Sequence, residues 1–281
     1  MMRQFLLLAA SAGLACPQIS GPDVRVYKTV GTTKLTAHLF RPAGDPRTSR
    51  PAIVLFHGGG WTAGSPEWVY DAAKRFAGYG AVALAAEYRL SDQKTITPLD
   101  AIADARDLIR WMRLNAAGLG VLPDRIAAYG VSAGGHLAAS LATLDNLAAD
   151  QPSAIPNAMV LISPAVSLAH DGWFQKILAG RASAGDVSPD EHVDKVLPPT
   201  AIFIGEADTL TPVGGARRFC DRVNEHGGHC EIHVYPGVGH LFTRKLDNQE
   251  DDFDPDPKVV LDARQKTDQF LAGRGFLTIA K

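Results

Sequence analysis

The chain has 281 residues, of which 46% are hydrophobic and 21% charged, a composition typical of a folded globular protein rather than a disordered one. Its 28 Lys and Arg side chains against 30 Asp and Glu give a formal net charge of −2, so no overall basic field favours nucleic acid as a partner. Three cysteines are too few for a disulfide-built scaffold, and no apolar run reaches the ~18 residues that a transmembrane helix needs.

The first fifteen residues have the layout of a secretory signal peptide. Arg3 precedes an apolar stretch at 5–15, and the helix-breaking Pro17 follows, which disfavours a buried first helix of the mature fold. The pattern predicts a periplasmic or secreted protein. The alternative is a membrane-anchored lipoprotein with its lipid anchor on Cys16, although Gly13 departs from the usual lipoprotein signal.

The chain then changes from stretches in which polar and apolar residues alternate to short, continuous apolar runs. Alternating stretches at 24–28 and 34–39 predict an antiparallel hairpin. The runs that follow are typical of strands buried on both faces, and segments of helical period lie between them. The expected strands are 52–56, 81–86, 126–129, 158–162, 201–204 and 229–235, and the expected helices are 68–79, 99–115, 135–144, 214–225 and 259–271.

Strands that alternate with helices predict an α/β fold: a mostly parallel central sheet with helices on both faces, preceded by the antiparallel hairpin. We find no internal repeat and no linker, so we expect a single domain over residues 23–275. Residues 165–197 have weak periodicity and predict either a small cap or a loop insertion.

The strongest chemical signal is the sequence GVSAGG at 130–135, between an expected strand and an alanine-rich helix. This Gly-x-Ser-x-Gly pattern predicts a nucleophile elbow, in which glycines permit a tight turn and Ser132 projects outward. The competing interpretation is a Gly/Ser turn with Ser132 as a helix N-cap. The flanking elements favour the nucleophile.

A glycine-rich loop, HGGGW at 57–61, follows the strand at 52–56. A flexible turn or a phosphate cradle is the alternative, but a phosphate loop would need Lys with Ser or Thr after the glycines. We expect the N–H groups of Gly58, Gly59 and Ala133 to form an oxyanion hole. His57 is then expected to order the loop by hydrogen bonding rather than to act as the base.

A nucleophilic serine needs a base and an orienting carboxylate, which follow it in the chain order Ser, acid, His on this type of fold. Among nine histidines we favour His240 as the base, because it follows the last strand in the loop PGVGH at 236–240. Asp208 lies past the carboxyl end of the strand at 201–204 and is the expected acid. Glu206 is its rival in the same loop.

These residues together resemble the α/β-hydrolase superfamily and, within it, bacterial esterases of the hormone-sensitive-lipase and acetylxylan/feruloyl-esterase type. The resemblance rests on the motifs at 57–61, 87–90 (EYRL), 130–135, 205–212 and 239–240, which span nearly the whole mature chain. It implies an α/β-hydrolase fold with Ser132 as nucleophile, His240 as base and Asp208 as acid. Two departures, the early hairpin and Ser91-Asp92 in place of the usual Ala-Pro, point toward the smaller, more open esterases.

The expected function is therefore hydrolysis of short-chain acyl esters of small molecules or carbohydrate, such as acetyl groups, through an acyl-enzyme. The chemistry needs only the triad and backbone donors, so no cofactor or metal is implied. One alternative is a serine peptidase of the prolyl-oligopeptidase type, which usually carries a propeller domain that this length cannot hold. Another is a non-catalytic receptor or adhesion protein, in which the triad is typically broken.

Three weaker features remain. Trp61 and Trp173 are candidate substrate-binding residues, with core packing as the alternative for Trp173. Cys220 on a late helix and Cys230 on the following strand are expected within disulfide range, with unpaired buried thiols as the alternative. The acidic run at 250–257 lacks EF-hand spacing and is expected to be a solvated loop, with a metal site or substrate contact as alternatives.

Overall fold

The computed structural model describes residues 21–45, 48–144, 151–251 and 253–279. The predictions of a signal peptide and of a lipid anchor on Cys16 lie outside these residues. None of the helices in the described ranges is long and apolar enough to cross a membrane.

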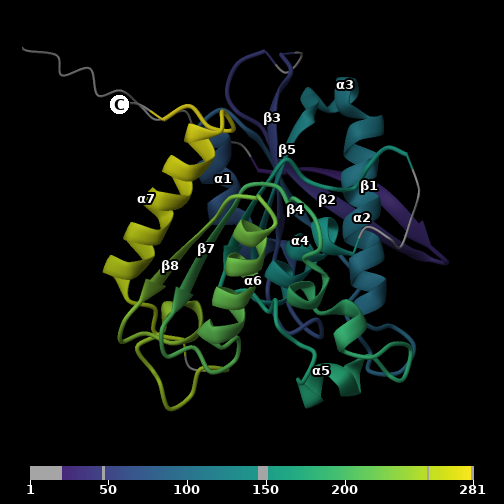
Figure 1. The fold of residues 1–281 in the computed structure, drawn as a ribbon. Coiled ribbons are helices and arrows are strands. Elements are labelled where there is room, and N and C mark those ends of the chain that lie inside the picture. Colours follow the sequence, from purple (N-terminus) through teal and green to yellow (C-terminus); the bar gives the residue numbers. More distant parts are fainter. Residues whose placement is uncertain (1–20, 46–47, 145–150, 252, 280–281) are drawn as a thin grey trace, which may run out of the picture.

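An eight-stranded sheet with the strand order β1-β2-β4-β3-β5-β6-β7-β8 forms the centre of the protein (Figure 1). β1 and β2 form the predicted antiparallel hairpin, β2 pairs antiparallel with β4, and the remaining neighbours are parallel. The strands are β1 Asp23–Val30, β2 Thr33–Phe40, β3 Arg50–Phe56, β4 Val82–Ala86, β5 Val121–Val131, β6 Ala158–Ile162, β7 Thr200–Gly205 and β8 Cys230–Tyr235. Every predicted strand is therefore present.

Helices cover both faces of the sheet. α2, α4 and α6 pack on one face, and α1 and α7 lie on the other (Figure 1). The helices are α1 Tyr70–Gly78, α2 Pro98–Leu114, α3 Ala116–Leu119, α4 Ala133–Thr143, α5 Gly172–Ile177, α6 Val213–Glu225 and α7 Pro257–Gly273. The sequence predicts five of these helices; the short α3 and α5, which span a single turn or little more, were not predicted.

Strand β3 illustrates why the central strands are apolar throughout. Ala52, Val54 and Phe56 pack under the helices of one face, whereas Ile53 and Leu55 pack under those of the other. All five side chains are fully buried. A strand with no solvent face has no polar alternation, so continuous apolar runs identify the parallel part of the sheet.

The segment at 165–197 begins at the carboxyl end of β6, the edge at which α5 appears in Figure 1, and its last residues lead back to the amino end of β7, where Val196 and Leu197 lie beside Gly227 and Gly228. They contain α5 and two single-turn 3₁₀ helices, η3 Gly185–Val187 and η4 Pro189–His192. The buried Asp190 in η4 pairs with Arg218 of α6 at 3.4 Å. The segment is thus a small, anchored insertion with little regular structure, which accounts for its weak periodicity.

Helix α6 and strand β8 are joined by a disulfide between Cys220 and Cys230, whose Cα atoms lie 5.3 Å apart. The two cysteines lie on either side of the turn at Gly227, which has a φ of 79°. This is the pairing that the helix–turn–strand spacing predicts.

Candidate active site

Ser132 lies in a sharp turn between β5 and α4, with the unusual backbone angles φ 53° and ψ −115°. The turn requires glycine at position 134, because a Cβ there would lie 2.2 Å from the carbonyl oxygen of Phe56 and 2.4 Å from that of His57. Strained backbone of this kind persists only when the surroundings fix it. The Gly-x-Ser-x-Gly sequence therefore brings the first turn of α4 directly against the loop after β3.

The structure brings Ser132, His240 and Asp208 together in a hydrogen-bonded chain. Ser132 Oγ lies 3.0 Å from His240 Nε2, and His240 Nδ1 lies 2.9 Å from Asp208 Oδ2. His240 and Asp208 are buried, whereas Glu206, the rival acid, is exposed. With Nδ1–H donated to the carboxylate, Nε2 is free to accept the serine proton, which is the arrangement that activates a serine nucleophile.

The carboxylate of Asp208 is held by its own loop. It accepts hydrogen bonds from the backbone N–H of Leu210 at 3.0 Å and of Thr211 at 2.8 Å. The Thr211 hydroxyl oxygen lies 2.9 Å from Asp208 Oδ2 and 3.1 Å from the carbonyl oxygen of Ser163. These donors compensate for the loss of water around a buried carboxylate.

Sequence reasoning missed Thr211 and Ser163 as supports of the site. Ser163 follows β6, has a φ of 42°, and accepts the N–H of Leu241 at its hydroxyl oxygen. The signal for Thr211 was available, since an aspartate often binds the backbone two or three residues ahead. The signal for Ser163 is its position at the carboxyl end of a buried parallel strand.

Two of the three candidate oxyanion donors, Gly58 and Ala133, lie next to the serine, and Gly59 follows Gly58 in the glycine loop. Ala133 is the first residue of α4, and a Cβ on Gly58 would lie 3.3 Å from Ser132 Cβ. Across the described ranges, no hydrogen bond between protein groups uses the N–H of Gly58, Gly59 or Ala133. N–H groups that have no protein acceptor and lie beside a nucleophile are available to bind the oxyanion that develops during acyl transfer.

His57 supports the glycine loop rather than contacting Ser132. Its ring stacks on Tyr88 at 4.3 Å, and its Nδ1 donates to the carbonyl of Gly58 at 2.7 Å. Burial lowers the pKa of His57, so the ring is neutral near pH 7. The buried Tyr88 hydroxyl donates to the carbonyl of His57 at 2.9 Å. Both contacts fix the backbone that carries the oxyanion donors.

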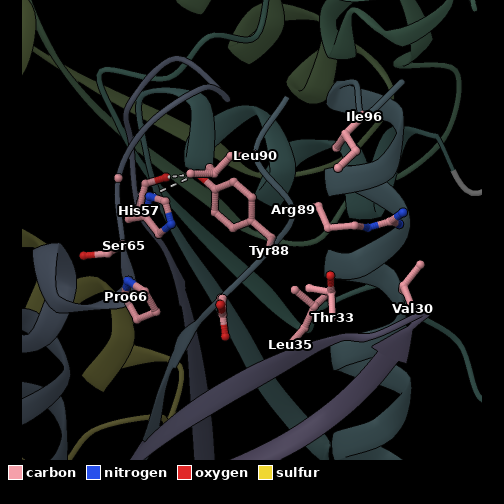
Figure 2. A pocket seen from close by; sticks show the side chains of 12 residues that line it. Val30, Thr33, Leu35, His57, Ser65, Pro66, Tyr88, Arg89, Leu90 and Ile96 are labelled. Atoms are coloured by element: carbon pink, nitrogen blue, oxygen red, sulfur yellow. Dashed lines mark hydrogen bonds between the residues drawn. The ribbon is translucent and has the colours of Figure 1, made fainter. Parts of the chain in front are cut away.

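A cavity of about 420 Å³ adjoins His57 and Tyr88. Figure 2 shows His57 and Tyr88 joined by hydrogen bonds in its wall, together with Thr33 and Leu35 of the hairpin. Ser132 and His240 are not among its lining residues. The cavity is therefore not the space around the candidate nucleophile, although His57 belongs to its wall.

An aromatic cluster surrounds Trp61, the last residue of the glycine loop. Trp61 is only 4% exposed; its indole N–H donates to His136 Nδ1 at 3.1 Å, and its ring lies 4.7 Å from Phe174. Burial lowers the pKa of His136 to about 4, and its Nε2–H donates to the carbonyl of Val187. Trp173 of α5 is 45% exposed, with its ring 6.2 Å from that of Trp61. Trp173 is thus partly exposed beside the glycine loop, whereas Trp61 is largely a packing residue.

Two aspartates of the acidic run at 250–257 make specific contacts. Asp254 forms a salt bridge with Arg244 at 2.8 Å, and Asp256 caps α7 by accepting the N–H groups of Lys258 and Val259. In the part of the chain that the structure describes, no group of three His, Cys, Asp or Glu side chains is arranged to hold a metal ion.

Comparisons with known proteins agree with this fold. The BD-FAE family matches residues 38–161. The apo form of Thermogutta terrifontis esterase 2 is similar at 35% identity with a TM-score of 0.81, over 95% of this chain and 99% of that one. An ethyl acetate hydrolase of Pseudomonas putida is 30% identical over 235 residues, 75% of this chain and 72% of that protein. The carboxylesterase NlhH of Mycobacterium tuberculosis is 38% identical over 128 residues, which span only 39% of its length.

The sheet, the strand-turn-helix at Ser132 and the structural relatives define an α/β-hydrolase. The chain belongs to the α/β-hydrolase serine esterases, in the branch that resembles hormone-sensitive lipase. The predicted fold class and the family resemblance are both confirmed.

Proposed function

We propose that the protein hydrolyses carboxylic esters through an acyl-enzyme on Ser132. The observation that carries this proposal is the 3.0 Å contact between Ser132 Oγ and His240 Nε2, with Asp208 bound to the opposite ring nitrogen. The N–H group of Ala133, at the start of α4, and Gly58, on which a Cβ would lie 3.3 Å from Ser132 Cβ, lie beside the same serine.

In the proposed mechanism, Ser132 Oγ attacks the ester carbonyl carbon while His240 Nε2 takes the hydroxyl proton. The carbonyl oxygen becomes an oxyanion that accepts hydrogen bonds from the N–H groups of Gly58, Gly59 and Ala133. His240 then gives its proton to the leaving alcohol, and the C–O bond breaks to leave the acyl group on Ser132. A water molecule, deprotonated by His240, hydrolyses this acyl-enzyme and restores the hydroxyl.

We propose short-chain acyl esters as the substrates, with acetyl groups on carbohydrate as the natural class to test. The exposed Trp173 supports this proposal, because a Cβ on Gly60 would lie 3.2 Å from its ring, directly beside the donor loop. An aromatic face at that place can limit the acyl chain or stack on a sugar ring. Structures of the Thermogutta terrifontis esterase hold propionate or butyrate, which also supports short acyl groups.

We further propose that the protein acts outside the cytoplasm, in the periplasm or as a secreted enzyme. The signal-like first fifteen residues and the disulfide between Cys220 and Cys230 support this location, because disulfides persist in oxidising compartments. A lipid anchor on Cys16 is the alternative. Cell fractionation of the producing strain, with detergent extraction of the membrane fraction, separates the three outcomes.

The test of the proposed activity is a series of p-nitrophenyl esters from acetate to decanoate, run in parallel with acetate release from acetylated xylan. We expect turnover to fall with acyl length and to vanish in Ser132→Ala. Trp173→Ala serves as the specificity variant and should extend the accepted acyl length without reducing turnover of the acetate. Cleavage of proline-containing peptides without ester turnover would favour the peptidase, and a folded wild-type chain inert to all substrates would favour the non-catalytic alternative.

A further inference from the structure

Gln249 connects the two loops that carry the acid and the base. Its Oε1 accepts the backbone N–H of His240 at 2.8 Å and the N–H of Thr209 at 3.2 Å. Its Nε2 donates to the carbonyl of Ala207 at 2.9 Å. Ala207 and Thr209 flank Asp208, so a single amide binds both neighbours of the acid and the backbone of the base itself.

The pocket around this amide fits glutamine and no isosteric residue. Two N–H donors face its oxygen, and carbonyl acceptors face its nitrogen, so a carboxylate or an apolar side chain would leave buried groups unpaired. Gln249 is only 4% exposed, and a Cβ on Gly239 would lie 2.4 Å from its Cδ. The residue before His240 must therefore be small for the amide to reach the base.

The chain around Gln249 is itself fixed at both ends. The 3₁₀ helix η5, His240–Phe242, is followed by a loop that closes on itself before α7. Arg244 N–H donates to the carbonyl of Asp254 at 2.9 Å, and Asp256 N–H donates to the carbonyl of Phe242 at 2.9 Å. These two hydrogen bonds join the ends of the loop that carries Gln249 and thereby restrict the position of its amide.

We propose that Gln249 is a positioning residue that sets the separation of Asp208 and His240 and thereby the distance from His240 Nε2 to Ser132 Oγ. The inference rests on the proposed function of this site. Gln249 touches neither substrate nor the reacting atoms; it acts through the backbones of the acid loop and the base. A displacement of about 1 Å at reacting groups can lower a rate about 10²-fold. Loss of the Gln249 hydrogen bonds should therefore lower kcat.

A second amide in the chain provides a matched control. Asn224 on α6 donates from Nδ2 to the carbonyl of Cys230 at 3.0 Å and accepts the N–H of Cys230 at 2.8 Å. It bridges backbone groups as Gln249 does, but at the amino end of β8, the end opposite the candidate site. Asn224 is exposed and makes two backbone hydrogen bonds, so its loss tests the effect of removing an amide bridge away from the site; only Gln249 lies between the acid and the base.

The experiment compares Gln249→Met, which keeps the side-chain volume without hydrogen bonds, with Asn224→Ala. Each variant is assayed for thermal unfolding, for kcat and KM on p-nitrophenyl acetate, and for the rate of labelling by a fluorophosphonate. We expect Gln249→Met to lower kcat and the labelling rate by about 10²-fold with KM within about threefold, and Asn224→Ala to lower only the melting temperature. Gln249→Asn, whose amide is one methylene too short to span both loops, should lose kcat similarly and serves if the methionine variant does not fold.

Wild-type kcat in folded Gln249→Met or Gln249→Asn would overturn the inference, as would an equal loss of kcat in Asn224→Ala. A wild-type protein that neither hydrolyses the ester nor is labelled would instead refute the proposed function. The two failures are therefore distinguishable in one set of assays.

Discussion

Reducing the bond between Cys220 and Cys230 should destabilise the protein by an amount set by the length of the loop it closes. The two cysteines are separated by 10 positions in sequence. For a loop of that length, the chain-entropy account gives about 9 cal/mol/K of lost entropy in the unfolded chain, or about 2.7 kcal/mol at 25 °C. For a protein of this size, that free energy corresponds to a fall in Tm of about 5–10 °C.

The assay is urea unfolding of the oxidised and the reduced wild-type protein, so that the same side chains are present in both states. Thiols counted on the denatured chain identify the redox state, with two more after reduction than before. The double variant Cys220→Ala/Cys230→Ala is the control, since reductant should leave its unfolding midpoint unchanged. Equal midpoints for oxidised and reduced wild-type protein would refute the entropic argument, and two free thiols at these positions without reductant would refute the bond.

Three further predictions concern groups in and around the site. Burial lowers the pKa of His136 to about 4, so between pH 6.5 and 4 the unfolded chain binds a proton that the folded chain does not. His136 should therefore contribute about 3 kcal/mol to the free energy of unfolding above about pH 6.5, a contribution that is lost by pH 4. His136→Gln should remove this part of the pH dependence in urea titrations across this range, and a pH dependence identical to that of the wild type would contradict the assignment. Asp208→Asn should lower kcat by about 10⁴-fold while the fold persists by circular dichroism, because the amide favours the wrong tautomer of His240; a kcat near wild type would remove Asp208 from the mechanism. Gly134→Ala should destabilise the protein by about 1–3 kcal/mol, because its Cβ meets the carbonyl of Phe56 at 2.2 Å; unchanged stability and turnover would mean that the elbow tolerates a side chain there.

The fold was predictable because its central strands are buried on both faces. A run such as 158–162 has no polar residue, and the whole of β6 is buried. The boundaries were less predictable: β5 begins at Val121, five residues before the expected strand, because its early residues pair only at the irregular edge with Arg50. The single-turn helices α3 and α5 are too short to produce a periodic signal.

The residues of the candidate site were predictable where the local sequence determines their position. Ser132 and Gly134 are linked by a tight turn, and Asp208 and His240 each follow a strand whose position was clear. The contacts of Gln249 could not be predicted in the same way, because its partners lie up to 42 positions away in sequence. Sequence patterns record short-range geometry, and the packing of one loop against another appears only in the folded structure.

The most direct test of the central claim is the intact mass of the protein after exposure to a fluorophosphonate, followed by mapping of the modified peptide. We expect one adduct per chain, located on Ser132 and absent from a folded Ser132→Ala protein. An unmodified wild-type chain, or an adduct on any other residue, would contradict the assignment of Ser132 as the nucleophile that His240 activates.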